Sequence, residues 1–540
     1  MFDLEMPIGK RKPLYRAFEI LPGFISYMAV ILLFILSYIN PVLGAGYVLL
    51  VVVVVFVKAV GVAFRTLNGY STMRKAIKVN WRQRLAHLQN PHRYYDELKS
   101  EEHNSFNYQK HLENLRFMSA AEIGTYPNPD QIIHAVIVAI FNESLEILRP
   151  TINAIERTTY PNQQIVVVLA YEESGGTATK EIVEILQKEY KGVFLDMFAV
   201  PHPEGIKNEV IGKGGNITSA GRFLAKYFRK QKIRFSNVIV TTLDSDNRPH
   251  KSYFDAVAYE YICCTDRKRR SYQPVSLFTN NIWDAPAATR VVATGNSFWT
   301  VVSSMRPHTL RNFASHSQSL DALYEMDFWS TRSITEDGHQ YWRSYFYFDG
   351  NYSVLPIHLP MGQDAVLSFT FWKTLKMQFV QLRRWAYGAS DIAYVATRLF
   401  SRKRNVPFFD CLMKFWRLVD SHVTWAFMAP IVAFGGFVPV IFSPHARTNI
   451  AAQELPSIVS NIQTVAMVGL FITIILSVRM LPKRPKRYKK GKMVLMIIQW
   501  ALMPITAIIY NSASAFYAQT RLMLGLYMNK FDATDKATKK

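Results

Sequence analysis

The chain is poor in cysteine and short of acidic residues. Three cysteines occur in 540 residues, Cys263, Cys264 and Cys411. Their spacing fits no metal-ligand pattern and their number is too small for a disulfide framework, so we expect free thiols in a reducing compartment. Lys and Arg exceed Asp and Glu by 23. Because the basic residues lie between apolar blocks, this excess indicates the loops of a membrane protein rather than a nucleic-acid binder.

A cleavable leader is not expected either. Two apolar stretches open the chain, residues 21–38 and 42–63, and each is near the ~20 residues that a helix needs to cross ~30 Å of hydrocarbon. The first stretch has no small-residue cleavage site, and Asn40-Pro41 between the two is typical of a tight turn. The pattern predicts a transmembrane hairpin.

Three further apolar stretches lie near the C-terminus, at residues 423–442, 458–478 and 493–526. Residues 483–492 carry seven positive charges, which places this loop in the cytoplasm. The same rule puts the basic residues 10–12 inside, so the middle region, residues 80–410, is expected to be cytosolic. The stretches lack the acidic pairs typical of ion pathways, which disfavours a transporter or channel.

Residues 132–250 alternate between strand-like and helix-like patterns. β-Branched and apolar runs predict strands at residues 135–140, 164–169, 193–200 and 237–243, and apolar residues at helical spacing predict helices at residues 144–155, 181–190 and 216–230. This order predicts an α/β domain with a doubly wound, mostly parallel sheet, inserted between transmembrane helices. In such sheets, ligands bind beyond the carboxyl ends of the strands.

Carboxylates gather at the predicted strand ends. Three groups follow strands: Asn142-Glu143, Glu172-Glu173 and Asp244-x-Asp246. Several carboxylates at one edge need a cation, or a ligand rich in hydrogen-bond donors, to be stable together. Asp244 and Asp246 offer the hard oxygen ligands that Mg²⁺ or Mn²⁺ prefers. Taken alone, an Asp-x-Asp sequence is also typical of a solvated turn.

Lys213 lies in a glycine-rich stretch, residues 212–216, directly before a predicted helix. Glycines allow close approach of a ligand to the backbone, the helix N-terminus favours an anion, and the lysine adds a point charge. The stretch therefore predicts an anion site, with an ordinary turn as the alternative.

Thr335-Glu336-Asp337 is a second acidic motif. A carboxylate beside a bound substrate can act as a general base, a role that suits Asp337. The alternative is a helix start with Thr335 as N-cap and acidic residues in the first turn. The two interpretations are compatible, because a helix N-terminus can position a base.

Gln381, Arg384 and Trp385 lie within one turn of a predicted amphipathic helix. An indole face can stack on the apolar face of a sugar ring, and a guanidinium can pair with phosphate. The helix pattern suits a membrane surface, although a helix packed on a domain core has the same pattern.

The chain resembles the membrane-bound family 2 glycosyltransferases, which include cellulose, chitin and hyaluronan synthases. The resemblance rests on three motifs that occur in this order between apolar segments: Asp244-x-Asp246, Thr335-Glu336-Asp337 and Gln381-x-x-Arg384-Trp385. The resemblance covers residues 130–536. It implies an A-type glycosyltransferase fold and an inverting reaction that moves a sugar from a UDP-sugar to a growing polysaccharide, with Mg²⁺ or Mn²⁺.

The resemblance also implies roles for individual residues. The expected donor-binding residues are Asn142, Glu143, Glu172, Lys213, Asn216, Asp244 and Asp246, the last two on the metal. Asp337 is the expected general base. The residues expected to bind the acceptor or the diphosphate are Glu336, Gln381, Arg384 and Trp385. The family has a small-residue turn on the acceptor side that Thr294-Gly295-Asn296 resembles.

Two regions depart from the family or extend the resemblance. The second strand ends at Glu172, where the family has a pair of aspartates that contact uracil. The identity of the nucleobase is therefore less well defined by the resemblance. We expect no second-messenger-binding β-barrel domain of the cellulose-synthase type. Phe531, Thr534 and Lys536 are similar to a gating loop that closes over the nucleotide, with chance similarity as the alternative. A cytosolic tail requires residues 493–526 to bend, at Pro504 or near residues 511–514.

The expected organisation is a multi-pass protein of the cell membrane: a hairpin at 1–66, a basic interfacial linker at 67–130, a cytosolic glycosyltransferase domain at 131–358, interfacial helices at 359–415, a transmembrane region at 416–526 and a cytosolic tail at 527–540. Single addition of a sugar to a membrane lipid is the main alternative function. A non-catalytic scaffold is disfavoured because every expected carboxylate is present.

Overall fold

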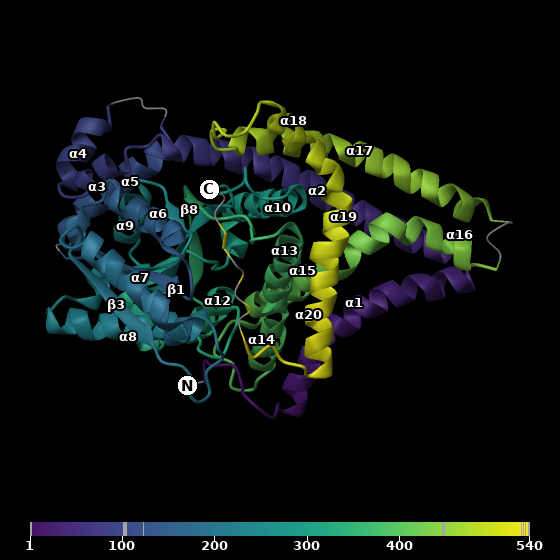
Figure 1. Cartoon of the computed structure of the whole chain (residues 1–540), viewed down its shortest axis with the longest axis horizontal. Coiled ribbons are helices and arrows are strands. Elements are labelled where there is room, and N and C mark those ends of the chain that lie inside the picture. The colour runs from purple at the N-terminus through teal and green to yellow at the C-terminus, as the bar shows by residue number, and fades with distance from the viewer. Residues whose placement is uncertain are drawn as a thin grey trace.

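The computed structural model describes residues 3–100, 105–122, 124–444 and 449–530, together with residues 532, 534, 536 and 537. An α/β domain lies at one end of the molecule, and long helices project from it (Figure 1). The first and last described residues both lie against this domain, because Glu5 contacts Arg343 and Lys536 contacts Asp246.

One eight-stranded sheet has the order β3-β2-β1-β4-β7-β6-β8-β5. The pairs β1–β2, β1–β4 and β2–β3 are parallel, and so is the pair β6–β8. The short strand β7 is antiparallel to both β4 and β6. The bounds are β1 (Ile133–Ile140), β2 (Ile165–Glu172), β3 (Asp196–His202), β4 (Val238–Asp244), β5 (Arg248–Pro249), β6 (Arg270–Leu277), β7 (Ser317–Ser319) and β8 (Ser353–Gly362). The prediction of a doubly wound, mostly parallel sheet is confirmed.

Helices cover both faces of this sheet. Alternate residues of β1 enter different apolar clusters: Val136 packs with Leu148 of α6, whereas Ile137 packs with Leu224 of α8. This burial on both faces explains the continuous apolar runs of the central strands. The helices of the domain are α6 (Leu145–Glu156), α7 (Gly176–Glu189), α8 (Lys213–Lys230), α9 (Tyr253–Cys263), α10 (Ala287–Ser304), α11 (Leu320–Glu325) and α12 (Glu336–Tyr347).

The segment between the N-terminal hairpin and the sheet forms α3 (Trp81–His87), α4 (Pro91–Leu98) and α5 (Tyr108–Ala120). Trp81 and Leu115 are buried in the same cluster as Tyr259 of α9, so these helices pack on the α/β domain. Contact of this segment with a membrane surface stays a prediction.

Four segments among the described residues are long and apolar enough to cross a membrane: Pro13–Ile39, Pro41–Ile77, Phe408–Phe442 and Gly491–Leu524. The long helices are α1 (Pro13–Ile39), α2 (Pro41–Ile77), α15 (Phe408–Phe434) and α17 (Ile450–Met480). Together with the short helix α16 (Val438–Phe442), they extend away from the domain (Figure 1). Asn40 accepts a hydrogen bond from Val42 N at 2.9 Å and caps α2, which fixes the turn of the hairpin.

The segment before the tail is broken. It consists of α18 (Gly491–Ile498), α19 (Met503–Thr506) and α20 (Ala513–Leu524), with a 3₁₀ turn at Gln499–Leu502 and a π-helical stretch at Ala507–Ser512. In Figure 1 the chain changes direction there, and α20 runs across the long helices. The tail then returns to the α/β domain, where Lys536 forms a backbone bridge with Leu367. The side of the membrane on which the tail lies stays a prediction.

Candidate active site

Lys213 joins the two acidic motifs. Its Nζ lies 2.8 Å from Oδ1 of Asp244, 3.3 Å from Oδ1 of Asp337 and 3.5 Å from Oε1 of Glu336. The lysine side chain is 9% exposed, whereas Asp244 is 35% exposed and Asp337 is 23% exposed. The arrangement leaves two of the carboxylates accessible and their cation largely enclosed.

The fold brings these residues together through the ends of three elements. Asp244 is the last residue of β4, Lys213 opens α8, and Glu336 and Asp337 form the first turn of α12. A Cβ atom on Gly214 would lie 2.2 Å from the Ser330 carbonyl oxygen, so the missing side chain lets the start of α8 approach the loop before α12. Thr335 occupies the N-cap position of α12 without a capping hydrogen bond from its side chain.

Burial and mutual charge set the protonation of this cluster. Burial acts to lower the pKa of Lys213, but Asp244, Asp337 and Glu336 outweigh it, so the pKa lies well above its usual value. Burial acts to raise the pKa of Asp244, and Lys213 and Lys536 reverse the effect, so that pKa is lowered. Burial and the charge of Asp337 raise the pKa of Glu336 well above its usual value, which favours a neutral Glu336.

A second cation, Lys536 of the tail, contacts the next carboxylate of the first motif. Its Nζ lies 2.7 Å from Oδ1 of Asp246 and donates to Ser245 Oγ at 2.6 Å, with Glu143 Oε1 at 3.7 Å. Phe531 lies outside the described residues, and Thr534 is described as half-buried in the same tail.

Of the two residues expected beyond β1, Glu143 is held by two hydrogen bonds. Glu143 accepts hydrogen bonds from Phe141 N at 2.8 Å and from Ser245 Oγ at 2.9 Å, which orients its carboxylate toward the Asp-x-Asp loop. Asn142 is exposed. Asn216 donates from Nδ2 to the Ala170 carbonyl at 2.9 Å, so it ties the start of α8 to β2.

Glu172, at the end of β2, lies in a separate polar cluster. Its Oε2 lies 2.9 Å from Nδ1 of His202, whose Nε2 lies 3.1 Å from Oε2 of Glu209. Burial acts to lower the pKa of His202, but Glu172 and Glu209 outweigh it and raise the pKa above its usual value.

The third motif lies on α13 (Phe371–Ala386), which continues through α14 (Asp391–Leu399) toward α15. Arg384 donates from Nη1 to the Asp532 carbonyl of the tail at 2.8 Å, and burial lowers the pKa of its guanidinium against the raising effect of nearby carboxylates that include Asp244. Gln381 accepts a hydrogen bond from Gln378 at 3.2 Å. The Trp385 ring centroid lies 6.0 Å from that of Phe278, so this indole already has an aromatic neighbour.

One expectation on the acceptor side is wrong. Thr294, Gly295 and Asn296 lie inside helix α10 and form no turn. Thr294 donates its hydroxyl hydrogen to the Arg290 carbonyl at 2.8 Å, as side chains within a helix commonly do.

The donor atoms at Asp244 and Asp246 fit a divalent cation that shares its ligands with a phosphate. Within the described ranges, no group of three or more His, Cys, Asp and Glu side chains is arranged to hold a metal ion. Mg²⁺ commonly uses only one or two carboxylates and completes its coordination with substrate phosphates and water. Lys213 contacts Asp244 at Oδ1, and the Asp244 side chain is 35% exposed. The two carboxylates suit such a shared site and not a closed protein cage.

Several residues near the motifs were not found from the sequence. Asp364 donates its backbone N–H to Asp246 Oδ2 at 2.8 Å, and burial followed by the charge of Asp246 raises the pKa of its carboxyl to about 7. Ser245 was a spacer in Asp-x-Asp, and His202 and Glu209 stand in no motif. The apolar strand pattern could locate the ends of β2 and β3, but it does not show which polar residues meet there.

No model of a known protein family and no curated protein sequence matches the chain. Among solved structures, the chain is similar to the mannosyltransferase PcManGT from Pyrobaculum calidifontis in complex with GDP-Man and Mn²⁺, with a TM-score of 0.38 and 12% identity over 83% of this chain and 98% of that one. It is also similar to a fragment of S. aureus TarS in complex with UDP-GlcNAc, with a TM-score of 0.35 and 10% identity over 73% and 92%. At this level of similarity, the donor, acceptor and metal must be inferred from the site itself.

Proposed function

We propose that the chain is a membrane glycosyltransferase that moves a sugar from a nucleotide sugar to an acceptor hydroxyl. The observation that carries the proposal is the position of Lys213, whose Nζ lies within 3.5 Å of Asp244, Glu336 and Asp337. Sugar transfer needs a positive centre for the leaving diphosphate and a base for the acceptor proton in one site. Both kinds of group meet at this end of the sheet.

Asp337 is the proposed general base. Its side chain is 23% exposed, whereas Glu336 is 3% exposed and its raised pKa favours the neutral form. In the transfer step the acceptor oxygen bonds to the anomeric carbon, and its proton passes to a carboxylate oxygen of Asp337. The bond from the anomeric carbon to the diphosphate breaks, and its electron pair leaves with the nucleoside diphosphate. A single displacement of this kind inverts the anomeric centre.

Lys213 and Arg384 are the proposed cations for the diphosphate. The charges of Asp244, Glu336 and Asp337 act to raise the pKa of the Arg384 guanidinium, although burial lowers it. A guanidinium can hold phosphate oxygens in a bidentate arrangement, and an ammonium adds a compact charge. Mg²⁺ or Mn²⁺ held by Asp244 and Asp246 would neutralise the diphosphate and make it a better leaving group.

The proposed donor is a UDP-sugar, with the nucleoside beyond the ends of β1 and β2. Asn142 is exposed there, and Glu172 has a carboxylate that could contact the nucleobase of the donor. The tail is proposed to close over the donor, because Lys536 contacts Asp246 and Asp532 contacts Arg384. The tail and the donor phosphates would then compete for Arg384, or share it. Lys536 of the tail would likewise compete with a metal ion for Asp246, or share it.

The proposed acceptor is a growing polysaccharide bound beside α13, with Gln381 and Trp385 as its platform. The helix presents polar and aromatic groups next to the proposed diphosphate site, and aromatic faces stack on sugar rings. The apolar segments are proposed to hold the enzyme in the cell membrane with the α/β domain in the cytosol, where nucleotide sugars are made. This organisation would let a lengthening product pass toward the membrane.

The test is nucleoside diphosphate release from a panel of UDP- and GDP-sugars with Mg²⁺ or Mn²⁺, using detergent-solubilised full-length protein. Asp337→Asn is expected to bind nucleotide as the wild type does and to lose turnover by about 10²-fold or more, since general-base catalysis contributes 10²–10⁴-fold. Asp96→Asn is the control, because Asp96 pairs with Lys99 on the surface of α4.

Three outcomes separate the alternatives. Near-normal turnover by Asp337→Asn contradicts the base assignment, and no turnover by the wild type with any sugar contradicts the proposed function. Product sizing then distinguishes the acceptors, because a ladder of lengths indicates a polymerase, whereas one sugar on a lipid indicates single addition.

A further inference from the structure

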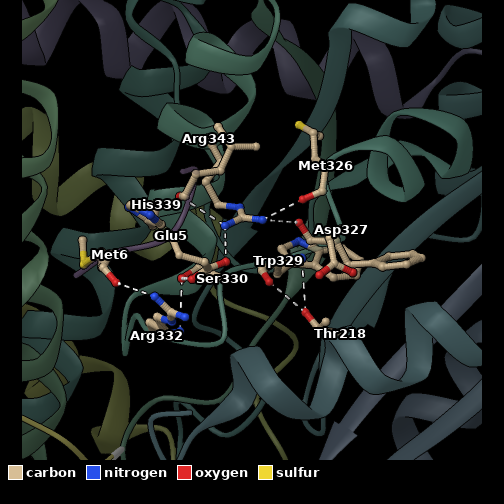
Figure 2. Close-up of polar contacts among 12 residues, drawn as sticks. Glu5, Met6, Thr218, Met326, Asp327, Trp329, Ser330, Arg332, His339 and Arg343 are labelled. Carbon is tan, nitrogen blue, oxygen red and sulfur yellow. Dashed lines mark hydrogen bonds and ion pairs between the residues drawn. The ribbon is translucent and has the colours of Figure 1, made fainter. Parts of the chain in front are cut away.

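Residues 3–6, here called the N-terminal strap, lie against α12 and the loop that precedes it. Figure 2 shows Glu5 and Met6 of the strap facing Ser330, Arg332 and Arg343. The strap is more than 300 residues from these partners in the sequence; Glu5 and Ser330, for example, are 325 positions apart. Such a contact lies outside all three motifs of the proposed active site.

Both oxygens of the Glu5 carboxylate are used. Oε2 accepts a hydrogen bond from Ser330 Oγ at 2.6 Å, and Oε1 forms an ion pair with Nη1 of Arg343. The carboxylate therefore links the loop before α12 to the body of that helix. A charge-assisted contact of this kind is stronger and more directional than a neutral hydrogen bond.

Arg343 needs the negative charge that Glu5 supplies. The arginine is 1% exposed, and its other contacts are neutral carbonyl oxygens of Met326 at 2.8 Å, Phe328 at 3.3 Å and Leu4 at 3.2 Å. A buried cation without a counter-charge is strongly disfavoured. Loss of the Glu5 charge would therefore act on the loop that carries these carbonyl groups.

The same loop forms the contact between α12 and α8. The Trp329 carbonyl accepts from Thr218 Oγ1 at 3.0 Å, and the Thr331 carbonyl accepts from Val210 N at 2.9 Å. The Ser330 carbonyl lies so close to Gly214 that no side chain fits between them. A shift of the loop therefore changes the distance between the starts of α8 and α12, where Lys213 and Asp337 stand.

The rest of the strap is held independently of Glu5. Met6 is 7% exposed and packs in the apolar cluster that includes Trp342. The Leu4 carbonyl accepts from the Tyr394 hydroxyl at 3.0 Å, and the Asp3 carbonyl accepts from the guanidinium of Arg398. A change confined to the Glu5 charge is thus expected to leave the strap in place.

We propose that Glu5 is a positioning residue for the general base, because its carboxylate bridges Ser330 and Arg343 and so holds the loop before α12 against the start of α8. This inference rests on the proposed function and adds to it a residue outside the motifs. Glu5 touches neither donor nor acceptor, so it acts only through the separation of Lys213 and Asp337.

The experiment compares Glu5→Gln with wild type in the full-length protein. We expect kcat to fall about tenfold, the KM for the donor to change less than twofold, and nucleotide affinity to stay the same. The pH–kcat profile should move to higher pH, because a larger separation of α8 from α12 weakens the effect by which Lys213 lowers the pKa of Glu336, the residue beside the base. Glu5→Asp, which keeps the charge, should recover part of kcat.

Matched controls separate positioning from folding. Glu97→Gln makes the same substitution at a surface residue that pairs with Arg93 on α4, and it should leave kcat and the pH profile unchanged. In the Arg343→Met background, Glu5→Gln should cause no further loss, since the two residues act as one unit. Nucleotide-binding stoichiometry gives the folded fraction of every variant.

Three results would overturn the inference. A wild-type kcat and pH profile in Glu5→Gln contradict positioning while leaving the proposed function intact. A loss of kcat matched by an equal loss of binding-competent protein, with an unchanged pH profile, shows that Glu5 serves stability alone. Absence of wild-type turnover with every nucleotide sugar removes the proposed function and the inference with it.

Discussion

Lys536 Nζ lies 2.7 Å from Oδ1 of Asp246, so the C-terminal tail places a positive charge on one of the two carboxylates expected to hold a divalent cation. Burial acts to lower the pKa of Lys536, but Asp246, Glu143 and Asp244 outweigh it and raise the pKa, which keeps the lysine charged. A charged lysine and a metal ion cannot use the same carboxylate oxygen. If Asp246 holds the proposed cation, tail position and cation binding would therefore be coupled through this residue.

The first prediction concerns this competition. Lys536→Ala is expected to tighten Mn²⁺ binding in the absence of nucleotide by roughly tenfold, which corresponds to about 1.4 kcal/mol. The reason is that Asp246 would no longer have to give up an ion pair. Electron paramagnetic resonance of free Mn²⁺ measures the affinity directly.

Lys530→Ala is the control for this prediction, because Lys530 lies in the same tail and contacts Ile211 through its backbone, with an exposed side chain. Equal Mn²⁺ affinities for wild type, Lys536→Ala and Lys530→Ala would show that the tail and the cation do not compete.

The second prediction concerns the cation between the acidic motifs. Lys213→Met leaves three carboxylates close together without their shared partner, and it removes a positive charge that lowers the pKa of Asp244 and of Glu336. We expect kcat to fall by at least tenfold and the acidic limb of the pH–kcat profile to move to higher pH. Lys226→Met, at an exposed position of the same helix, should leave both unchanged. A profile of lower height but unchanged shape would show that Lys213 does not govern the protonation of Asp244 and Glu336.

The third prediction follows from the raised pKa of His202. Glu172 and Glu209 stabilise the charged imidazole against the effect of burial. Because the folded-state pKa exceeds the unfolded value of about 6.5, this stabilisation is complete below pH ~6.5 and is lost as the pH rises through the folded-state pKa. The melting temperature of the wild type should therefore fall over this window more steeply than that of His202→Gln. His308→Gln, at an exposed histidine, should follow the wild type.

The first half of the sheet could be predicted because its strands are buried on both faces. β1, β2 and β4 are continuous apolar runs, and turn or helix patterns separate them. The second half could not, because β7 is only Ser317–Ser319 and its polar side chains are satisfied inside the protein. Thr241 and Ser317, for example, share a hydrogen bond of 2.7 Å across the sheet. Hydropathy alone gives no strand signal for such residues.

The candidate site shows the same division. The strand pattern placed Asp244 at a ligand-binding edge of the sheet, and the resemblance to family 2 glycosyltransferases implied that Lys213 and Asp337 belong to the same site. The structure brings the three side chains together. The contacts of Glu5 and Lys536 join residues that are hundreds of positions apart, and no local pattern announces them. Glu172 was expected with the donor residues, but its partner His202 lies in no motif. Long-range packing decides these contacts.

The last prediction concerns the close approach of α8 to the loop before α12. A Cβ atom on Gly214 would lie 2.2 Å from a backbone oxygen of Ser330, so Gly214→Ala must move one of the two segments. Overpacking of this kind typically costs about 1–3 kcal/mol. We expect a lower melting temperature and a fall in turnover of at least tenfold, because the displaced segments carry Lys213 and Asp337.

Gly46→Ala is the matched substitution, since Gly46 is also helical and nothing lies within 4 Å of the added carbon. Its melting temperature and turnover should equal or exceed those of wild type, because alanine is the better helix former. If Gly214→Ala behaved like Gly46→Ala, the contact between α8 and the Ser330 loop could accommodate a methyl group without a change in stability or turnover. The separation of Lys213 from Asp337 would then be set elsewhere, by the packing of α12 on the apolar cluster around Trp342.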